Sequence, residues 1–125
     1  MRRSISAILA VPTVVNGLMM MLSGPFWYMS VRGVSDTGPY NDHFVRDIGA
    51  AFVVAGLALA ARAWRPRYWA AAVAGAAFLA LHALLHLLMV IDGRDQHAVF
   101  DLITVVLPAG LAPYFAFPAK GEVHA

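Results

Sequence analysis

The chain has 125 residues, of which 61% are hydrophobic and only 13% are charged. Soluble domains usually carry about a quarter charged residues, and a chain this short hides only about two-thirds of its unfolded surface when it folds in water. The composition therefore excludes an ordinary soluble enzyme. The formal net charge is +2 and the basic residues are scattered, so no nucleic-acid partner is expected. The absence of cysteine excludes disulfides, thiolate nucleophiles, cysteine-bound zinc and iron–sulfur clusters.

Four apolar stretches are long enough to cross a bilayer, which takes about 20 mostly apolar residues in a helix. We predict spans at about residues 5–29, 44–64, 68–91 and 98–117. The first is uncharged from Ser4 to Val31, and its length favours a retained span over a cleaved signal peptide. Together the spans predict an all-α, integral membrane four-helix bundle that forms a single transmembrane domain over residues 1–125, with the lipid bilayer as its first partner.

The second span needs polar residues at both ends, because its uncharged run, residues 48–61, would make only about 21 Å of helix. Extension draws Arg46 and Asp47 into one end of the helix, and Arg62 is expected to snorkel toward the surface at the other end. Asp42 precedes this helical run and is expected to be its N-cap.

The basic residues predict the orientation of the bundle. Six of them fall on one side of a four-span topology: Arg2, Arg3, Arg62, Arg65, Arg67 and Lys120. The positive-inside rule then places both termini in the cytoplasm, with His124 of the tail in solvent. We therefore expect a protein of the bacterial inner membrane.

Three pairs of polar residues share a four-residue spacing, which places both members of a pair on one face of a helix. The pairs are His43 with Asp47, His82 with His86, and His97 with Asp101. All three fall at the outer ends of their spans, and helix bundles commonly build metal and cofactor sites from imidazoles and carboxylates on facing helices. This pattern predicts a site on the outer, periplasmic side that binds a transition metal such as Zn, Cu, Fe or Mn, or haem.

His82 and His86 are the expected primary ligands, with His43 as a third. Asp47 or Asp101 would add a ligand or orient an imidazole. For haem, two histidines one turn apart cannot both be axial ligands, so one of them would pair with His43 or with His97 of the neighbouring helices.

Other interpretations of these polar residues stay open. The histidines of the third span could instead join helices by hydrogen bonds or transfer protons. An ionised Asp101 needs a partner inside the membrane. Arg46 is a candidate ion-pair partner for Asp101 and also for Asp47. Asn16 is the one strongly polar side chain deep in the first span, and we expect it to face the bundle.

Three functions are consistent with this sequence. The first is metal or haem binding at the outer site, serving redox chemistry or metal handling. The second is a structural or assembly subunit of a larger membrane complex, or of a homo-oligomer. The third is proton or small-solute transport. No nucleophile elbow, phosphate-binding loop or H-E-x-x-H motif is present, so the sequence does not indicate a particular enzyme activity. Enzyme activity is left open.

Two segments carry a resemblance. Residues 41–49 read N-D-H-F-V-R-D-I-G, and residues 82–86 read H-A-L-L-H. In these segments the chain resembles a class of small, uncharacterised bacterial four-span membrane proteins that carry an N-x-H-F-x-R-D-x-G segment and a later H-x-x-x-H pair. Its architecture is also loosely similar to that of DoxX-like proteins. The resemblance covers most of the chain and implies a four-span fold with a polar site, without a substrate.

Overall fold

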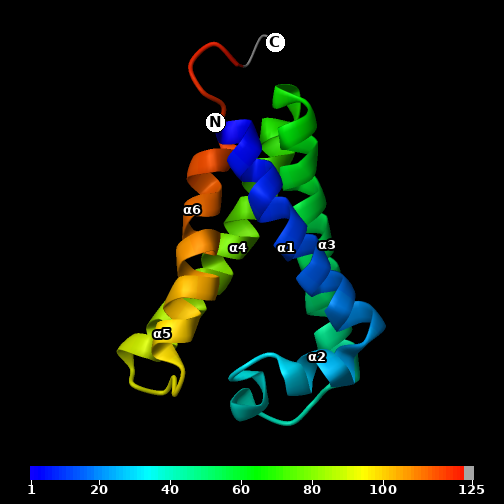
Figure 1. The fold of residues 1–125 in the computed structure, drawn as a ribbon, viewed down its shortest axis with the longest axis vertical. Coiled ribbons are helices and arrows are strands. Elements are labelled where there is room, and N and C mark those ends of the chain that lie inside the picture. Colours follow the sequence, from blue (N-terminus) through cyan, green and yellow to red (C-terminus); the bar gives the residue numbers. More distant parts are fainter. Residues whose placement is uncertain (123–125) are drawn as a thin grey trace.

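The computed structural model describes residues 1–122, so His124 lies outside the described part of the chain. Those residues form helices and no strand (Figure 1). Four segments are long and apolar enough to cross a membrane: Arg2–Leu22, Asp42–Trp64, Pro66–Ile91 and Ala98–Ala116. Only 11% to 33% of the most apolar part of each segment is buried within the chain. The expected all-α four-helix bundle is confirmed, and its exposed apolar surface is that of an integral membrane protein.

The long helices pack side by side in two pairs. Helix α1 (Arg2–Leu22) packs along α3 (Asp42–Trp64), and α4 (Trp69–Ile91) packs along α6 (Leu107–Ala116). Further contacts between α3 and α4, and between α1 and α6, join the two pairs. The N-terminus and the last described residues, 117–122, lie at one end of the bundle, which we call the terminal end (Figure 1). The opposite end, the far end, carries the connections made by residues 23–41 and 92–97.

The first span is shorter than predicted. Helix α1 stops at Leu22, and a separate helix, α2 (Gly24–Ser30), follows it. The break falls at Ser23, whose backbone is neither helical nor extended (φ −145°, ψ 49°), directly before Gly24 and Pro25. Pro25 has no N–H to donate, and its ring would clash with the carbonyl four residues earlier if α1 continued through it. Proline is well tolerated in the first turn of a helix, so Pro25 ends α1 and begins α2. A short 3-10 turn, η1 (Val34–Thr37), completes the connection to α3.

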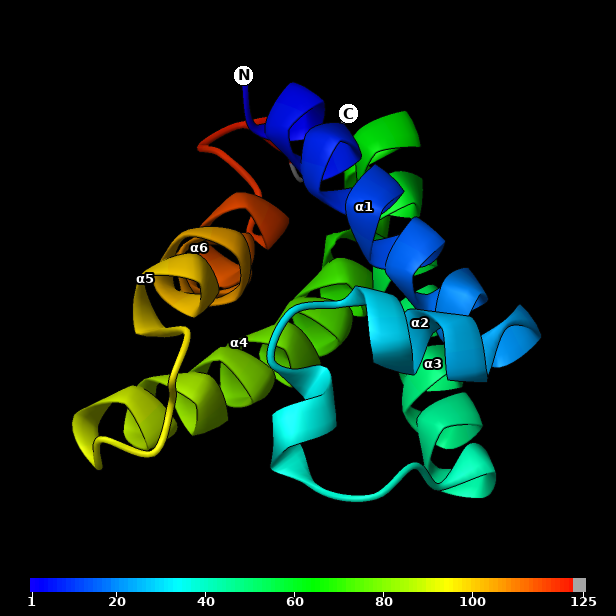
Figure 2. The same ribbon diagram turned by 60° about the horizontal axis from the view of Figure 1, so that its bottom comes forward.

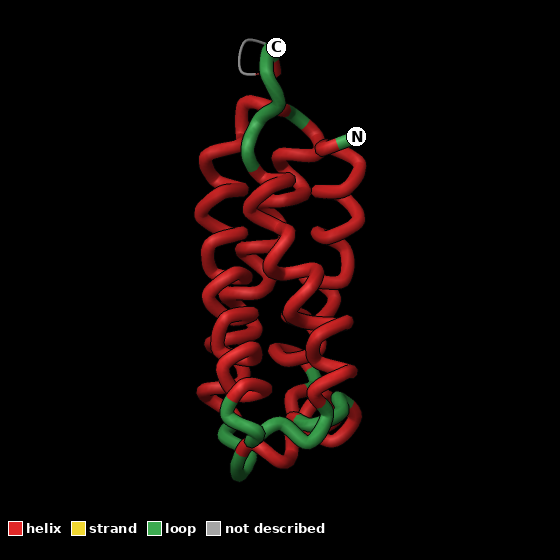
Figure 3. The backbone as a smooth tube through the Cα atoms, turned by 90° about the vertical axis from the view of Figure 1, so that its left-hand side faces the viewer, coloured by secondary structure: helices red, strands yellow, loops and turns green. Residues whose placement is uncertain are grey.

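The helices converge at the terminal end and diverge at the far end (Figures 1 and 2). The buried core explains this shape, because it consists mostly of alanines near the terminal end: Ala10, Ala55, Leu59, Ala72, Ala76, Leu79, Ala112 and Ala116. Small side chains let membrane helices approach closely. Viewed from the side, the helices run along the long axis of the molecule (Figure 3).

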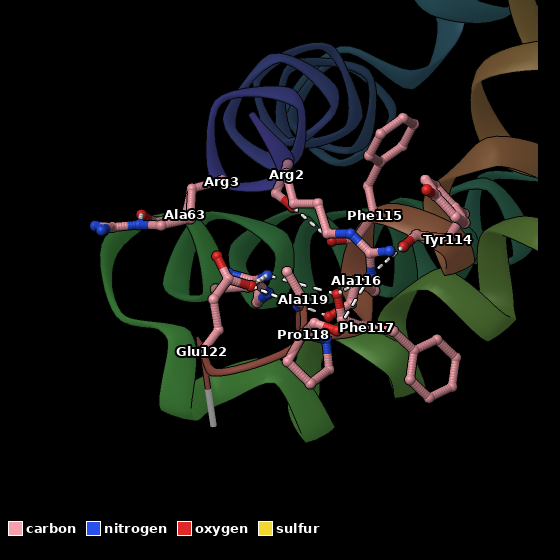
Figure 4. A network of polar contacts seen from close by, with 12 residues as sticks. Arg2, Arg3, Ala63, Tyr114, Phe115, Ala116, Phe117, Pro118, Ala119 and Glu122 are labelled. Carbon is pink, nitrogen blue, oxygen red and sulfur yellow. Dashed lines mark hydrogen bonds and ion pairs between the residues drawn. The ribbon is translucent and has the colours of Figure 1, made fainter. Parts of the chain in front are cut away.

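Arginine side chains close the terminal end by binding carbonyl groups at helix ends (Figure 4). Arg2 Nη1 donates to the carbonyl of Phe117 at 2.9 Å, and to those of Tyr114 and Pro118. Arg3 donates to the last carbonyls of α3, on residues 63 and 64, at 2.9 and 2.7 Å. The last carbonyls of a helix lack partners within the helix and carry its negative dipole end. Arginines from α1 therefore cap both α3 and α6.

Arg62 makes the third contact of this kind, and its predicted snorkelling to the surface is wrong. Its side chain is fully buried, and its Nε donates to the carbonyl of Ala116 at 3.2 Å. Its Nη2 lies 2.7 Å from Glu122 Oε2, while Nη1 is buried without a partner among residues 1–122. The same carboxylate accepts from the Ala119 N–H, which, together with Arg62, lowers the pKa of Glu122. We call Arg2, Arg3 and Arg62 the arginine clasp.

Candidate functional site

The polar centre of the far half is a contact between α4 and the last span. His86 Nδ1 lies 2.5 Å from Asp101 Oδ2. The side chains are only 24% and 13% exposed, so this is a largely buried pair in a span that faces lipid. An ionised carboxylate can only accept a hydrogen bond. When Asp101 is ionised and His86 is neutral, the contact places the imidazole proton on Nδ1 and leaves Nε2 as the free ring nitrogen.

Asp101 is presented by an irregular turn in the last span. Helix α5 (Ala98–Asp101) continues into η3 (Leu102–Val106), a π-helical segment in which the Leu107 N–H donates to the carbonyl of Leu102, five residues earlier. Pro108 follows, and a proline ring would clash with the carbonyl four residues before it in a regular α-helix. The wider π turn relieves this clash. Sequence reasoning missed the turn, although Pro108 inside a span was its signal.

His82 lies one turn before His86 on α4 and faces aromatic rings. Its ring centroid is 4.7 Å from that of His86, in an edge-to-face arrangement. Phe52 of α3 lies edge-on to the His82 ring at 5.2 Å, and Phe78 of α4 stacks on it at 6.4 Å. The two histidines and Asp101 thus form a continuous group, which we call the His–Asp site. Its two imidazoles come from the pair predicted to be the primary ligands.

His43 and Asp47 lie elsewhere, at the start of α3. His43 Nε2 is 3.3 Å from Asp47 Oδ2, and the two side chains are 90% and 64% exposed. The start of α3 and the end of α4 belong to the two helix pairs that diverge at the far end (Figure 2). Across residues 1–122, no three His, Asp or Glu side chains are arranged to hold a metal ion together. The predicted meeting of three polar pairs is not present there.

His97, which was predicted to share a helix face with Asp101, contacts a different acid. It lies 3.3 Å from Asp36, which belongs to the η1 turn. Arg32 lies over the ring of Phe100, with its Cζ 5.6 Å from the ring centroid. These two contacts connect the loop after α2 to the start of the last span. His97 therefore joins the two helix pairs at the far end, outside the His–Asp site.

The polar residues at the start of α3 also differ from the prediction. Arg46 pairs with Asp42 at 2.9 Å, rather than with Asp47 or Asp101. Asn41, rather than Asp42, is the N-cap, because its side chain accepts from the N–H of residue 44 at 3.0 Å. Four-residue spacing brings both Asp42 and Arg46 onto one helix face, where the pair is exposed to water.

Asn16 makes polar contacts inside the α1–α2 region. Its Oδ1 accepts from Trp27 Nε1 at 2.8 Å, and its Nδ2 donates to the Met20 sulfur at 3.6 Å. The side chain thus ties α2 back onto α1 and satisfies the indole N–H. Its contacts explain why a polar residue occurs deep in the first span, and they involve no residue of the His–Asp site.

Comparisons of the chain with protein-family models, with curated proteins and with solved structures found no match. What the site does must therefore be argued from its geometry and chemistry.

Proposed function

We propose that this integral membrane protein binds a transition metal ion or haem iron at the His–Asp site and serves redox chemistry or metal handling. The observation that carries the proposal is the 2.5 Å contact between His86 Nδ1 and Asp101 Oδ2. Imidazoles that bind metals almost always donate their other ring N–H to a carboxylate, a carbonyl or water. This partner fixes the tautomer and makes the free nitrogen a better ligand. His86 has such a partner, supplied by a different span.

His82 is the second ligand in this proposal for a metal ion. Imidazole nitrogens suit Zn, Cu, Fe and Ni, and a carboxylate can add the charge that a divalent ion favours. Haem needs only one of the two imidazoles on a given face of the iron, and His86 is the better supported of them. A bound metal would supply Lewis acidity, and haem iron would supply one-electron chemistry. The protein contributes orientation and a largely lipid-surrounded setting.

The orientation we propose places the far end, and with it the His–Asp site, on the periplasmic side of a bacterial inner membrane. The support comes from charge: the terminal end carries the six basic residues of the clasp, the α3–α4 connection and the tail, whereas six of the seven acids lie between residues 36 and 101. Loops rich in Lys and Arg stay on the cytoplasmic side.

Proton transfer is a second candidate function, favoured by the continuity of the same group. Asp101 contacts His86, and the His86 ring lies 4.7 Å from the His82 ring. An imidazole can accept a proton at one ring nitrogen and donate one from the other, so a chain of such groups can pass a proton. This candidate differs from the first in needing no metal, which makes the two separable by experiment.

The test is metal analysis together with a visible absorption spectrum, on detergent-purified wild-type protein supplied with Zn, Cu, Fe, Mn and haem in turn. We expect one metal or haem per chain. His86→Ala should abolish binding, and Asp101→Asn should weaken it about 10- to 100-fold, the usual effect of removing such a supporting partner.

Two matched controls remove histidines outside the site. His43→Ala and His97→Ala each delete an imidazole whose nearest acid is a different residue from Asp101. Both should retain the metal or haem. Wild-type protein that binds none of the five, or a His82→Ala/His86→Ala variant that binds as well as wild type, would refute the proposal. If the wild type is metal-free but reconstituted vesicles show proton flux that His86→Ala removes, the second candidate is correct. If neither metal or haem binding nor proton flux is found, the hypothesis of a structural subunit of a larger complex remains.

A further inference from the structure

The connection between α3 and α4 holds two arginines against two aromatic rings. The Trp64 and Tyr68 rings stack at 6.3 Å, with 22° between their planes. Arg65 Cζ lies 4.4 Å from the Trp64 ring centroid, and Arg67 Cζ lies 5.0 Å from that of Tyr68. Arg67 Nη2 also donates to the Tyr68 hydroxyl at 3.0 Å. We call these four residues the arginine–aromatic cluster.

The charges of this cluster are not neutralised by the described part of the chain. The arginine ion pairs within residues 1–122 are made by Arg46, Arg62 and Arg94. Arg65 and Arg67 make none, and both are exposed. The one acid near this end, Glu122, is bound by the buried guanidinium of Arg62. Two exposed guanidinium groups, each on one of two stacked rings, therefore have no carboxylate partner within residues 1–122.

The position of the arginine–aromatic cluster along the membrane normal matches the depth of phospholipid headgroups. The cluster lies at the junction of two segments that are long and apolar enough to cross a membrane. Trp64 is the last residue of α3, Arg65 follows it, and η2 (Pro66–Tyr68) contains the other two residues. Tryptophan and tyrosine rings prefer the depth of the headgroups, so they fix the depth of the arginines that lie on them. A guanidinium fork matches phosphate oxygens in shape and charge.

We propose that the arginine–aromatic cluster binds the headgroup phosphate of an anionic phospholipid. The rings hold both guanidinium groups in place before a lipid arrives, which reduces the entropy lost on binding. The lipid, rather than free phosphate, is the occupant because the cluster joins two membrane-crossing segments and its rings lie at headgroup depth. The proposal is independent of the His–Asp site, which lies in the far half of the bundle.

Native mass spectrometry of the detergent-purified protein, with added phosphatidylglycerol or phosphatidylcholine, tests this proposal. We expect wild-type protein to bind phosphatidylglycerol in preference. Each basic residue near an anionic surface contributes about fivefold to binding, so Arg65→Gln/Arg67→Gln should weaken it about 25-fold. Arg94→Gln is the matched control, since it removes an exposed arginine from the far end, and it should bind like wild type.

Two further measurements separate charge, shape and phosphate source. Arg65→Lys/Arg67→Lys keeps both charges but loses the planar fork, and should bind more weakly than wild type and more tightly than the glutamine variant. Binding by wild type should fall as NaCl is raised, because exposed charges are screened, and this result does not depend on any variant folding. Equal binding of both lipids, unchanged binding by the glutamine variant, or displacement by inorganic phosphate at equal concentration would overturn the proposal.

Discussion

Substituting alanine for Gly17 is expected to loosen the packing of α1 on α3. A Cβ atom at this position would lie 2.5 Å from the carbonyl oxygen of Gly49, 2.8 Å from the backbone nitrogen of Val53 and 2.9 Å from Phe52 Cβ. Ordinary contacts of a Cβ begin at 3.4 Å. Two of the three neighbours are backbone atoms, which cannot rotate away as the end of a side chain can. Helix α1 must therefore withdraw from α3 by about 0.9 Å at this point.

The expected magnitude follows from comparison with a second glycine. Overpacking a well-packed contact costs about 1–3 kcal/mol. Alanine also favours the helix over glycine by about 1 kcal/mol, which offsets part of that cost. Gly110 of α6 has no atom within 4 Å of an added Cβ, so Gly110→Ala receives the propensity gain without the clash. The difference in unfolding free energy between the two variants should thus be about 1–3 kcal/mol.

The assay is unfolding of the purified protein in mixed micelles with a rising fraction of sodium dodecyl sulfate, followed by circular dichroism at 222 nm. Gly17→Ala should unfold at a lower detergent fraction than wild type, and Gly110→Ala at the same or a higher fraction. Equal midpoints for the two variants would show that α1 and α3 are not in backbone contact at Gly17, and would refute this description of their packing.

Three other perturbations give measurable results. Asn41→Ala removes the N-cap of α3 and should destabilise the protein by about 1 kcal/mol in the same unfolding assay. Trp27→Phe leaves Asn16 without its indole donor and should cost about 1 kcal/mol, with Trp27→Leu as a comparison that also removes the ring. Because the pKa of Glu122 is lowered in the folded chain, its contact with Ala119 should stabilise the tail above the ordinary glutamate pKa and be lost as pH falls through the lowered one. Limited proteolysis of the tail should therefore accelerate at acid pH, and a Glu122→Gln variant should lose this pH dependence.

Much of the fold could be predicted from the sequence, because lipid constrains a chain so strongly. A span must be about 20 residues long and apolar, and the predicted ends at Trp64 and Ile91 agree with the structure. The end of the first span was missed because composition alone gives no weight to one Gly–Pro step. The apolar sequence continues through Gly24 and Pro25, whereas helix α1 ends at Leu22.

The candidate site could be predicted only in part. Four-residue spacing correctly put His82 and His86 on one face of α4, because that relation is local to a helix. The partner of Asp101 depends instead on how α4 packs against the last span. The sequence suggested Arg46 as the partner of Asp101, but Arg46 pairs with Asp42. Spacing also gave Asp47 as the acid beside His43, whereas the acids beside His86 and His97 required the tertiary structure.

The arginine clasp makes the bundle dependent on the order in which its helices enter the membrane. Arg62 is synthesised with α3, but the carbonyl of Ala116 and the carboxylate of Glu122 that it binds emerge more than 50 residues later. Until α6 arrives, a buried guanidinium would lack both partners, which is costly in a lipid environment. We therefore expect Arg62 to remain in the headgroup layer during biosynthesis and to become buried when the last helix docks. A chain truncated before residue 107 would leave the Arg62 guanidinium exposed, and this exposure would distinguish it from the fully assembled bundle.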